Sequence, residues 1–122
     1  MSGYRKALRY SEEACQLEPQ NGDLLSTLGV AYYRAGNYEK ALDVLMRSDK
    51  INAHKDNGSR PTDLAFLGMT LEQLGHAKEA GAKLQLLRER MKDPRFAQDA
   101  GAPGFLREAE ELLAKPKPPS SK

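Results

Sequence analysis

The chain repeats one pattern of leucine, glycine and alanine, and this repeat limits the folds that it can adopt. The segment LGVAYYRAGNYEKAL begins at Leu28, and LGMTLEQLGHAKEAG begins 39 residues later at Leu67. A leucine, two glycines and an alanine are identical in the two segments, and most of the other matching apolar positions keep their apolar character. Such matching preserves the shape of a packed unit and leaves its surface free to vary. The sequence therefore predicts two copies of one structural unit.

Each unit is predicted to form two helices joined by a tight turn. Over residues 23–35 apolar side chains recur at steps of three and four, which is the stripe of an amphipathic helix. Asn21 or Asp23 can cap the start of this helix. Gly36 suits the left-handed residue that ends a helix, so we expect a second, antiparallel helix from residue 38 to about residue 51.

Gly29 lies inside the first helix, where a glycine costs about 1 kcal/mol relative to alanine. Placed against Ala41 of the second helix, it removes side-chain bulk from both sides of the crossing. The two axes can then approach at the short end of the roughly 8–10 Å range of helix packing. A larger residue at Gly29 is expected to push the pair apart.

The same unit returns after a polar connection, Ala53 to Arg60, which makes the spacing five residues longer than a period of about 34 residues. Upstream, the segment 4–8 matches the segment 38–42, so the chain begins with the second half of a repeat. Downstream, an apolar stripe behind Pro103 predicts a terminal capping helix. The expected organisation is one domain over 1–115, with a half repeat (4–20), repeat one (22–55), an insertion (56–60), repeat two (61–94) and a capping region (95–114), followed by a disordered tail (115–122).

These motifs resemble the tetratricopeptide repeat, whose pattern is Trp-x2-Leu-Gly-x2-Tyr, then Ala-x3-Phe, then Pro within about 34 residues. The matching positions are Leu25, Leu28, Gly29, Tyr32, Ala41 and Leu45 in repeat one, and Leu64, Leu67, Gly68, Leu71, Ala80 and Leu84 in repeat two. Leucine replaces the Trp and the Phe, and Ala53 stands where Pro would close repeat one. The resemblance implies an all-α fold, a right-handed α-solenoid of antiparallel helix pairs with about two and a half repeats and a capping helix.

The last part of the chain carries a second resemblance. DLAFLGMTLEQLGHAKEA, followed by GFLREAEELL, is similar to C-terminal repeat segments of large bacterial multidomain proteins, some of which carry serine/threonine kinase domains. Together with the half repeat at the start, this indicates a segment of a larger protein.

The tetratricopeptide resemblance implies that the first helices line a concave groove for an extended or helical segment of a partner protein. A non-catalytic protein-binding module is therefore the first hypothesis. For Phe66 and Met69, the alternative interpretation is that they pack between neighbouring helices and do not contact a ligand. Relatives that grip the C-terminal carboxylate of chaperones use Lys and Asn where this chain has Ser26, Val30 and Phe66, so we do not expect that ligand. The predicted groove residues are Asp23, Ser26, Thr27, Val30, Tyr33, Arg34, Thr62, Ala65, Phe66, Met69, Glu72 and Gln73.

A structural or self-assembly role is the alternative hypothesis. The helix over residues 4–18 has no partner helix before it in the repeat, so one of its faces is expected to be uncovered. That face would stack on another repeat of a parent chain or on a second copy, giving a homodimer. The residues predicted for it are Ala7, Leu8, Ala14 and Cys15.

The balance of charge argues against nucleic acid as a partner. The chain holds 19 Lys and Arg against 17 Asp and Glu, a formal net charge of +2. Three of the lysines lie in the tail KPKPPSSK, so the remainder holds 16 basic and 17 acidic residues. This balance lacks the basic surface that phosphate binding requires, and RNA binding ranks behind both other hypotheses. The Pro116-x-x-Pro119 spacing in the tail suits a proline-reading domain, but a solvated tail is favoured.

The chain offers no set of residues for catalysis or metal binding. His54 lies in the polar connection and His76 at a helix joint, and neither has the spacing of a metal site or of a nucleophile and its base. We expect no enzyme activity, metal or cofactor. The lone Cys15 cannot form an internal disulfide, and its neighbours indicate a packed thiol. Apolar runs far shorter than the roughly 20 residues of a membrane span predict no membrane contact. The lone cysteine and a start that does not resemble a signal peptide predict a cytoplasmic location.

Overall fold

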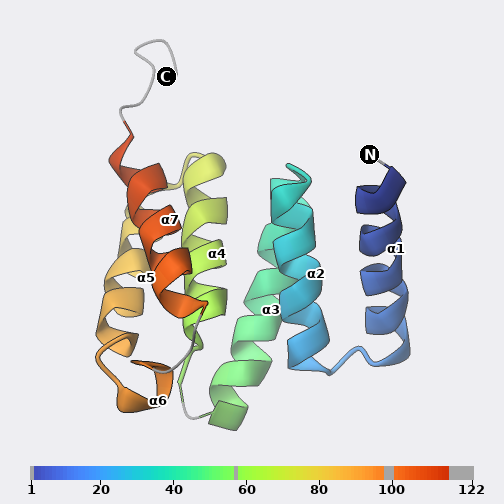
Figure 1. Ribbon diagram of the computed structural model, residues 1–122, viewed down its shortest axis with the longest axis horizontal. Coiled ribbons are helices and arrows are strands. Elements are labelled where there is room, and N and C mark those ends of the chain that lie inside the picture. Colours follow the sequence, from blue (N-terminus) through green and yellow to red (C-terminus); the bar gives the residue numbers. More distant parts are fainter. Residues whose placement is uncertain (1, 57, 98–100, 116–122) are drawn as a thin grey trace.

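The computed structural model describes residues 2–56, 58–97 and 101–115, and the described elements are all α-helices (Figure 1). The predicted tail, apart from Lys115, lies outside these residues, as does Asn57 of the predicted insertion. The helices are α1 (Ser2–Leu17), α2 (Gly22–Arg34), α3 (Tyr38–Asp56), α4 (Pro61–Gln73), α5 (Ala77–Arg90), α6 (Pro94–Ala97) and α7 (Ala102–Ala114).

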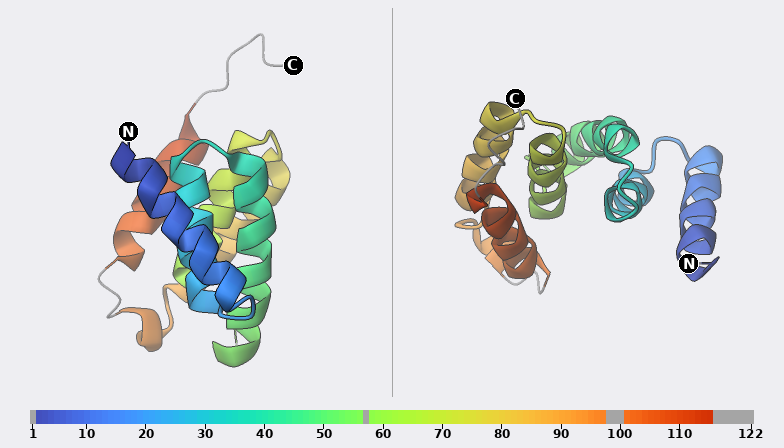
Figure 2. Two further views of the ribbon diagram at one scale, coloured as in Figure 1. Left: turned by 90° about the vertical axis from the view of Figure 1, so that its right-hand side faces the viewer. Right: turned by 90° about the horizontal axis from the view of Figure 1, so that it is seen from above.

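The helices pack in sequence order into a bent row. α2 and α3 form one antiparallel pair and α4 and α5 the next, while α1 packs on α2 and α7 packs on α4 and α5 (Figure 1). Seen from above, the row curves, and α1 and α7 lie at its two ends (Figure 2). The inner, concave side of the curve is the side of α2 and α7.

Both joints within the pairs turn at a glycine with positive φ, as the repeat predicts. Gly36 has a φ of 82° and Gly75 a φ of 88°. In each joint the N–H of the next residue donates to the carbonyl oxygen five residues earlier, at 2.9 Å in the first and 2.8 Å in the second. This is the left-handed termination that glycine allows, so the repeated glycines set the antiparallel geometry of both pairs.

Of the two predicted caps of α2, the structure uses Asn21. Its side-chain oxygen accepts a hydrogen bond from the Leu24 N–H at 3.1 Å. Asp23 lies in the first turn and forms an ion pair with Arg60 instead. The start of α2 is therefore satisfied by the residue that precedes the helix, as N-cap geometry requires.

α3 is longer than expected, and the predicted polar connection from Ala53 is wrong at its start. The helix continues to Asp56, which gives it 19 residues against the 14 of its counterpart α5. The five residues beyond the repeat period thus lengthen a helix. Polar residues do not end a helix by themselves, and the Asp56 carboxylate accepts from the Arg60 guanidinium just before α4.

α4 is buried on all its sides, although one apolar stripe was expected. Pro61 and every residue over 63–71 are buried, because α2, α3, α5 and α7 all pack around this helix. The predicted core stripes are confirmed in both helices of the second pair. The buried stripe residues are Leu64, Leu67 and Leu71 on α4 and Ala80, Leu84 and Leu87 on α5.

Gly29 does allow close packing of α2 on α3, but against Leu45 rather than Ala41. A Cβ atom at Gly29 would lie 2.5 Å from both Cγ and Cδ2 of Leu45, a side chain with no exposed surface. The counterpart Gly68 on α4 is less constrained. A Cβ there would lie 3.5 Å from the Lys83 Cβ, which is an ordinary contact.

A buried carboxylate joins the two pairs. Asp63, on α4, accepts from Ser26 Oγ at 2.7 Å, from Ser48 Oγ at 3.0 Å and from Asn52 Nδ2 at 3.0 Å. The donors come from α2 and α3, so one side chain holds three helices. Burial raises the pKa of Asp63 above its usual value, although the three hydrogen bonds act in the opposite direction.

The two glycines give a matched pair of substitutions. We expect Gly29→Ala to destabilise the fold, because overpacking costs about 1–3 kcal/mol while the gain in helix propensity is only about 1 kcal/mol. Gly68→Ala should gain that propensity without the clash. Urea denaturation of both variants measures the free energies of unfolding, and equal stabilities would contradict the contact between Gly29 and Leu45.

Asp63→Asn tests the buried carboxylate through pH. Because the folded-state pKa is raised, the folded chain keeps a proton that the unfolded chain loses above the usual Asp pKa. Stability of the wild type should therefore fall as pH rises through that window, and this contribution is absent from Asp63→Asn. Urea denaturation from pH 3.5 to 7, spanning about the usual Asp pKa, should show the variant gaining stability relative to the wild type as pH increases. A constant difference would mean that Asp63 is not perturbed.

Candidate protein-binding surface

α7 covers a large part of the concave side. It lies alongside α4 and α5 (Figures 1 and 2). Ala102 and Ala109 of α7 are buried in this contact. The predicted capping helix therefore exists, and it lies on the concave face of the second pair.

A row of aromatic rings fixes this arrangement. The rings of Phe66 and Phe105 meet edge to face with centroids 5.1 Å apart, and Phe66 meets Tyr33 in the same way at 5.6 Å. Tyr33 continues the row to Tyr38, at 5.4 Å. Such edge-to-face pairs are favourable arrangements of aromatic quadrupoles. The four rings of this row come from α7, α4, α2 and α3, so aromatic contacts connect all four helices.

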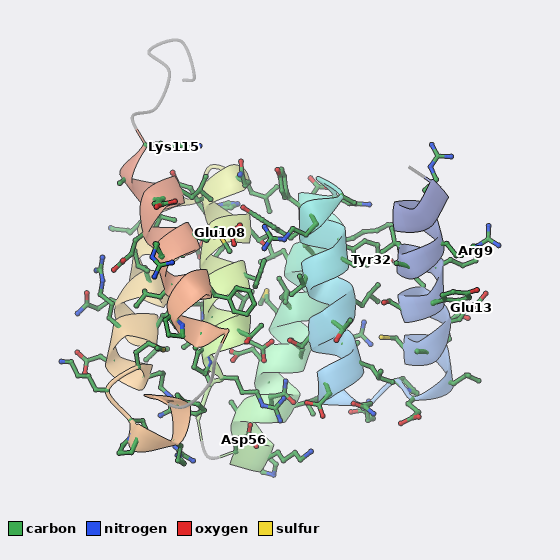
Figure 3. The ribbon with its side chains drawn as sticks, viewed as in Figure 1. Arg9, Glu13, Tyr32, Asp56, Glu108 and Lys115 are labelled. Atoms are coloured by element: carbon green, nitrogen blue, oxygen red, sulfur yellow. The ribbon has the colours of Figure 1, made fainter. Side chains whose placement is uncertain are left out.

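Arg34 adds a polar link between α2 and α7. Its guanidinium lies over the ring of Phe66, with Cζ 5.0 Å from the centroid. It also donates to both carboxylate oxygens of Glu108, at 3.0 Å from Nη2 to Oε1 and through Nη1 to Oε2. A paired fork of this kind combines charge with fixed direction. Glu108 faces the gap between α7 and α2 in Figure 3.

Three predicted groove residues do not line an open groove. Ala65, Phe66 and Met69 are at most 1% exposed, because α7 and the neighbouring helices cover α4. Their apolar character was interpreted as a floor for a ligand, whereas in the structure it serves packing within the chain. Tyr33 is buried as well.

The other predicted residues are more accessible, and most have partners within the chain. Ser26 donates to Asp63, Thr27 donates to the Asp23 carbonyl oxygen at 3.1 Å, and Gln73 Nε2 lies 3.5 Å from the Tyr33 hydroxyl. Thr27, Asp23, Arg34 and Gln73 are exposed, while Ser26, Val30, Thr62 and Glu72 are half-buried.

One part of the concave side remains hollow. A cavity of about 440 Å³ lies between the first turns of α2 and α4 and the short helix α6. Four of the predicted residues line it: Asp23, Ser26, Thr27 and Thr62. Arg60, Pro61 and Phe96 complete the lining and were missed. The position of Arg60 could have been predicted from the local sequence, because it precedes Pro61 at the start of α4. Phe96 reaches the cavity only because the chain turns back after α5.

The α1 face predicted for self-association is partly covered. Leu8 packs against the core and Cys15 is buried, both on the α2 side, so these two residues are not part of an open face. Ala7 is exposed and Ala14 half-buried. Burial raises the pKa of the Cys15 thiol.

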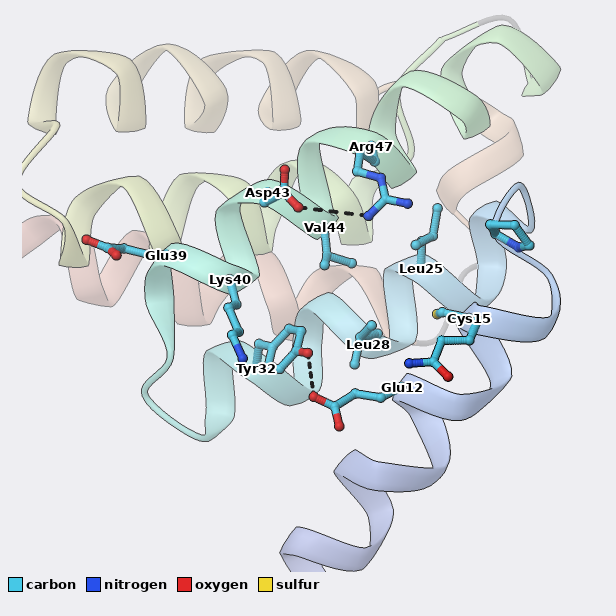
Figure 4. A pocket seen from close by; sticks show the side chains of 12 residues that line it. Glu12, Cys15, Leu25, Leu28, Tyr32, Glu39, Lys40, Asp43, Val44 and Arg47 are labelled. Carbon is cyan, nitrogen blue, oxygen red and sulfur yellow. Dashed lines mark hydrogen bonds and ion pairs between the residues drawn. The ribbon is translucent and has the colours of Figure 1, made fainter.

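A second hollow, of about 700 Å³, lies between α1, α2 and α3 (Figure 4). At its edge the Tyr32 hydroxyl donates to Glu12 Oε2 at 2.5 Å, which ties α1 to α2. Burial, followed by this bond to a carboxylate, raises the pKa of Tyr32 to about 12. The rim mixes acidic and basic side chains, among them Asp43 and Arg47.

The described residues hold no group of three or more His, Cys, Asp or Glu side chains placed to bind a metal ion. His54 is exposed near the end of α3, and exposed His76 lies 3.6 Å from Glu79 through Nδ1. Within the same residues, no helix has both the length and the apolar character needed to cross a membrane.

The sequence model of one protein family, described as tetratricopeptide repeat, matches residues 4–59. The matched range includes most of α1 and all of α2 and α3, so this part of the chain is similar to the tetratricopeptide repeat family. The described helices pack pairwise in sequence, consistent with a tetratricopeptide-like helical array. No curated protein matches the chain. Domains of this family are generally protein–protein interaction modules and typically non-catalytic.

Phe105→Ala should loosen α7 and leave the helix pairs folded. Because Phe105 is half-buried, we expect a loss of about 2 kcal/mol, below the roughly 3–5 kcal/mol of a fully buried Phe. Amide hydrogen exchange should quicken in α7 far more than in α3. Leu86→Ala, at an exposed apolar position of α5, is the matched control. Equal acceleration in every helix would show that Phe105 has no local role.

Proposed function

We propose that this chain binds a segment of another protein on its concave side, along the exposed face of α2 and across the cavity between α2, α4 and α6. The general role of tetratricopeptide domains in protein interaction supports the class of function. The cavity of about 440 Å³ supports the location, because four residues predicted for the groove line it.

The cover formed by α7 supports the same location. α7 already occupies the face of α4 where Ala65, Phe66 and Met69 lie, so a ligand has access to the other end of the groove. Thr27 and Asp23 are exposed residues of α2 that line this end of the groove.

The lining indicates what kind of segment fits. The Arg60 guanidinium is already held by Asp56 and Asp23, so its charge is balanced. Phe96 presents part of a ring, with Arg90 and Arg95 stacked on it at 5.0 and 5.1 Å. We therefore expect an extended peptide without a dense cluster of charge, held by polar backbone contacts near Thr27 and by one apolar side chain on Phe96.

Thr27→Arg tests the location. Peptides would be selected from a displayed library against the wild-type chain, and their affinities measured for the wild type and two variants. Because the arginine fills the cavity mouth, Thr27→Arg should weaken binding at least tenfold, about 1.4 kcal/mol. The control is Gln85→Arg, which adds the same charge at an exposed position of α5.

Circular dichroism establishes that both variants fold. Peptides that bind wild type and Thr27→Arg equally would overturn the proposed location, as would selected peptides whose binding depends on Gln85 instead.

A further inference from the structure

α1 carries two faces, and α2 covers only one of them. Leu8 and Cys15 pack toward α2, and Glu12 accepts from Tyr32 there. The other face carries the residues Ala7, Tyr10, Ala14 and Leu17, here named the outer stripe. Tyr10 is 62% exposed and Leu17 is 84% exposed. Among the residues that the structure describes, these are the two most exposed large apolar side chains.

The outer stripe corresponds to positions that are packed on another helix of this chain. The matching positions 34 residues later on α3 are Ala41, Val44, Ser48 and Ile51. Three of them are buried and Ile51 is half-buried, because α3 lies inside the row. On α1, at the end of the row, Ala7, Tyr10 and Leu17 are exposed and Ala14 is half-buried (Figure 2).

The spacing of the outer stripe suits one further helix. Its residues follow one another at steps of three, four and three, which is the seam of a two-helix coiled coil. Alanine alternates with the larger Tyr10 and Leu17, so the large side chains of one helix can pack over the alanines of another.

The charges of α1 indicate the direction of that helix. Arg5, Lys6 and Arg9 lie in its first half, while Glu13 lies in the second half and Glu18 follows its end. This order opposes the helix macrodipole, which favours acidic residues at the start and basic residues at the end. An antiparallel helix with the same sequence would place acidic residues beside the basic half and basic residues beside the acidic half. Arg9 and Glu13 project from α1 away from α2 (Figure 3).

We infer that the outer stripe pairs with the outer stripe of a second copy of this chain, with the two α1 helices antiparallel about a two-fold axis. Tyr10 of each copy packs over Ala14 of the other, and Leu17 over Ala7. Such an interface is isologous and closes at the dimer. It leaves the concave side free, so it is independent of the peptide-binding proposal.

Sedimentation velocity on the full chain, from low micromolar to several hundred micromolar, tests the pairing. The mass should rise from 13.5 kDa toward twice that value. Leu17→Glu should return the chain to monomer over the whole range, because it places a carboxylate in the seam. Leu86→Glu, which changes an exposed leucine of α5, is the matched control and should dimerise as the wild type does.

A charge exchange tests the direction. Arg9→Glu should weaken dimerisation at least tenfold, because it brings a carboxylate near Glu13 of the second copy. Adding Glu13→Arg in the same chain should restore dimerisation, because positions 9 and 13 then again carry opposite charges. Both variants change exposed residues, and circular dichroism checks their helix content. Added salt should weaken the wild-type dimer.

A monomeric mass at every concentration would overturn the inference. So would a dimer that survives Leu17→Glu, or one that Leu86→Glu weakens equally, because either result places self-association elsewhere. A dimer lost in Leu17→Glu but unaffected by Arg9→Glu would overturn the antiparallel arrangement.

Discussion

The burial of α4 on every side is the constraint on which the rest of the structure depends. Four helices meet α4, and its contacts use apolar, carboxylate and aromatic side chains. Leu67 and its stripe pack toward the core, Asp63 receives hydrogen bonds from α2 and α3, and Phe66 joins α2 to α7. Over residues 63–71, a helix enclosed in this way has no face left for a ligand, and only its first turn borders the cavity beside α6. α4 therefore joins the pair α2–α3 to the pair α4–α5 and to α7.

The position of α7 follows from the same constraint and shapes the function. Phe105 of α7 packs against the ring of Phe66, and this contact removes apolar area from water. Arg34 gains a partner in Glu108 and stays over that ring. The concave side is therefore divided into a half closed by the chain itself and a half that is open at the cavity beside Thr27. The fold narrows the surface on which a partner segment can lie.

Local sequence signals account for the features that depend on a few neighbouring residues. Gly36 and Gly75 end the first helices because only glycine adopts the left-handed region at little cost. Asn21 caps α2 through a side chain three residues from its donor. Polar composition by itself predicted helix ends less well than these local motifs did. The polar residues after Ala53 were compatible with a loop and with a helix. α3 continues to Asp56, whose carboxylate accepts from nearby Arg60 and whose carbonyl oxygen accepts from distant Arg95.

The sequence by itself determined the helix pairs, the turns at Gly36 and Gly75 and the need for a small residue at Gly29, because spacing and glycine placement act within one or two turns. Only the tertiary structure decided which face of each helix is free. Phe66 and Leu17 are both apolar residues on helix stripes, yet one is enclosed by α7 and the other is exposed at the end of the row. The exposure of an apolar helix stripe depends on which distant segment packs on it. The sequence of the stripe does not determine which segment that is.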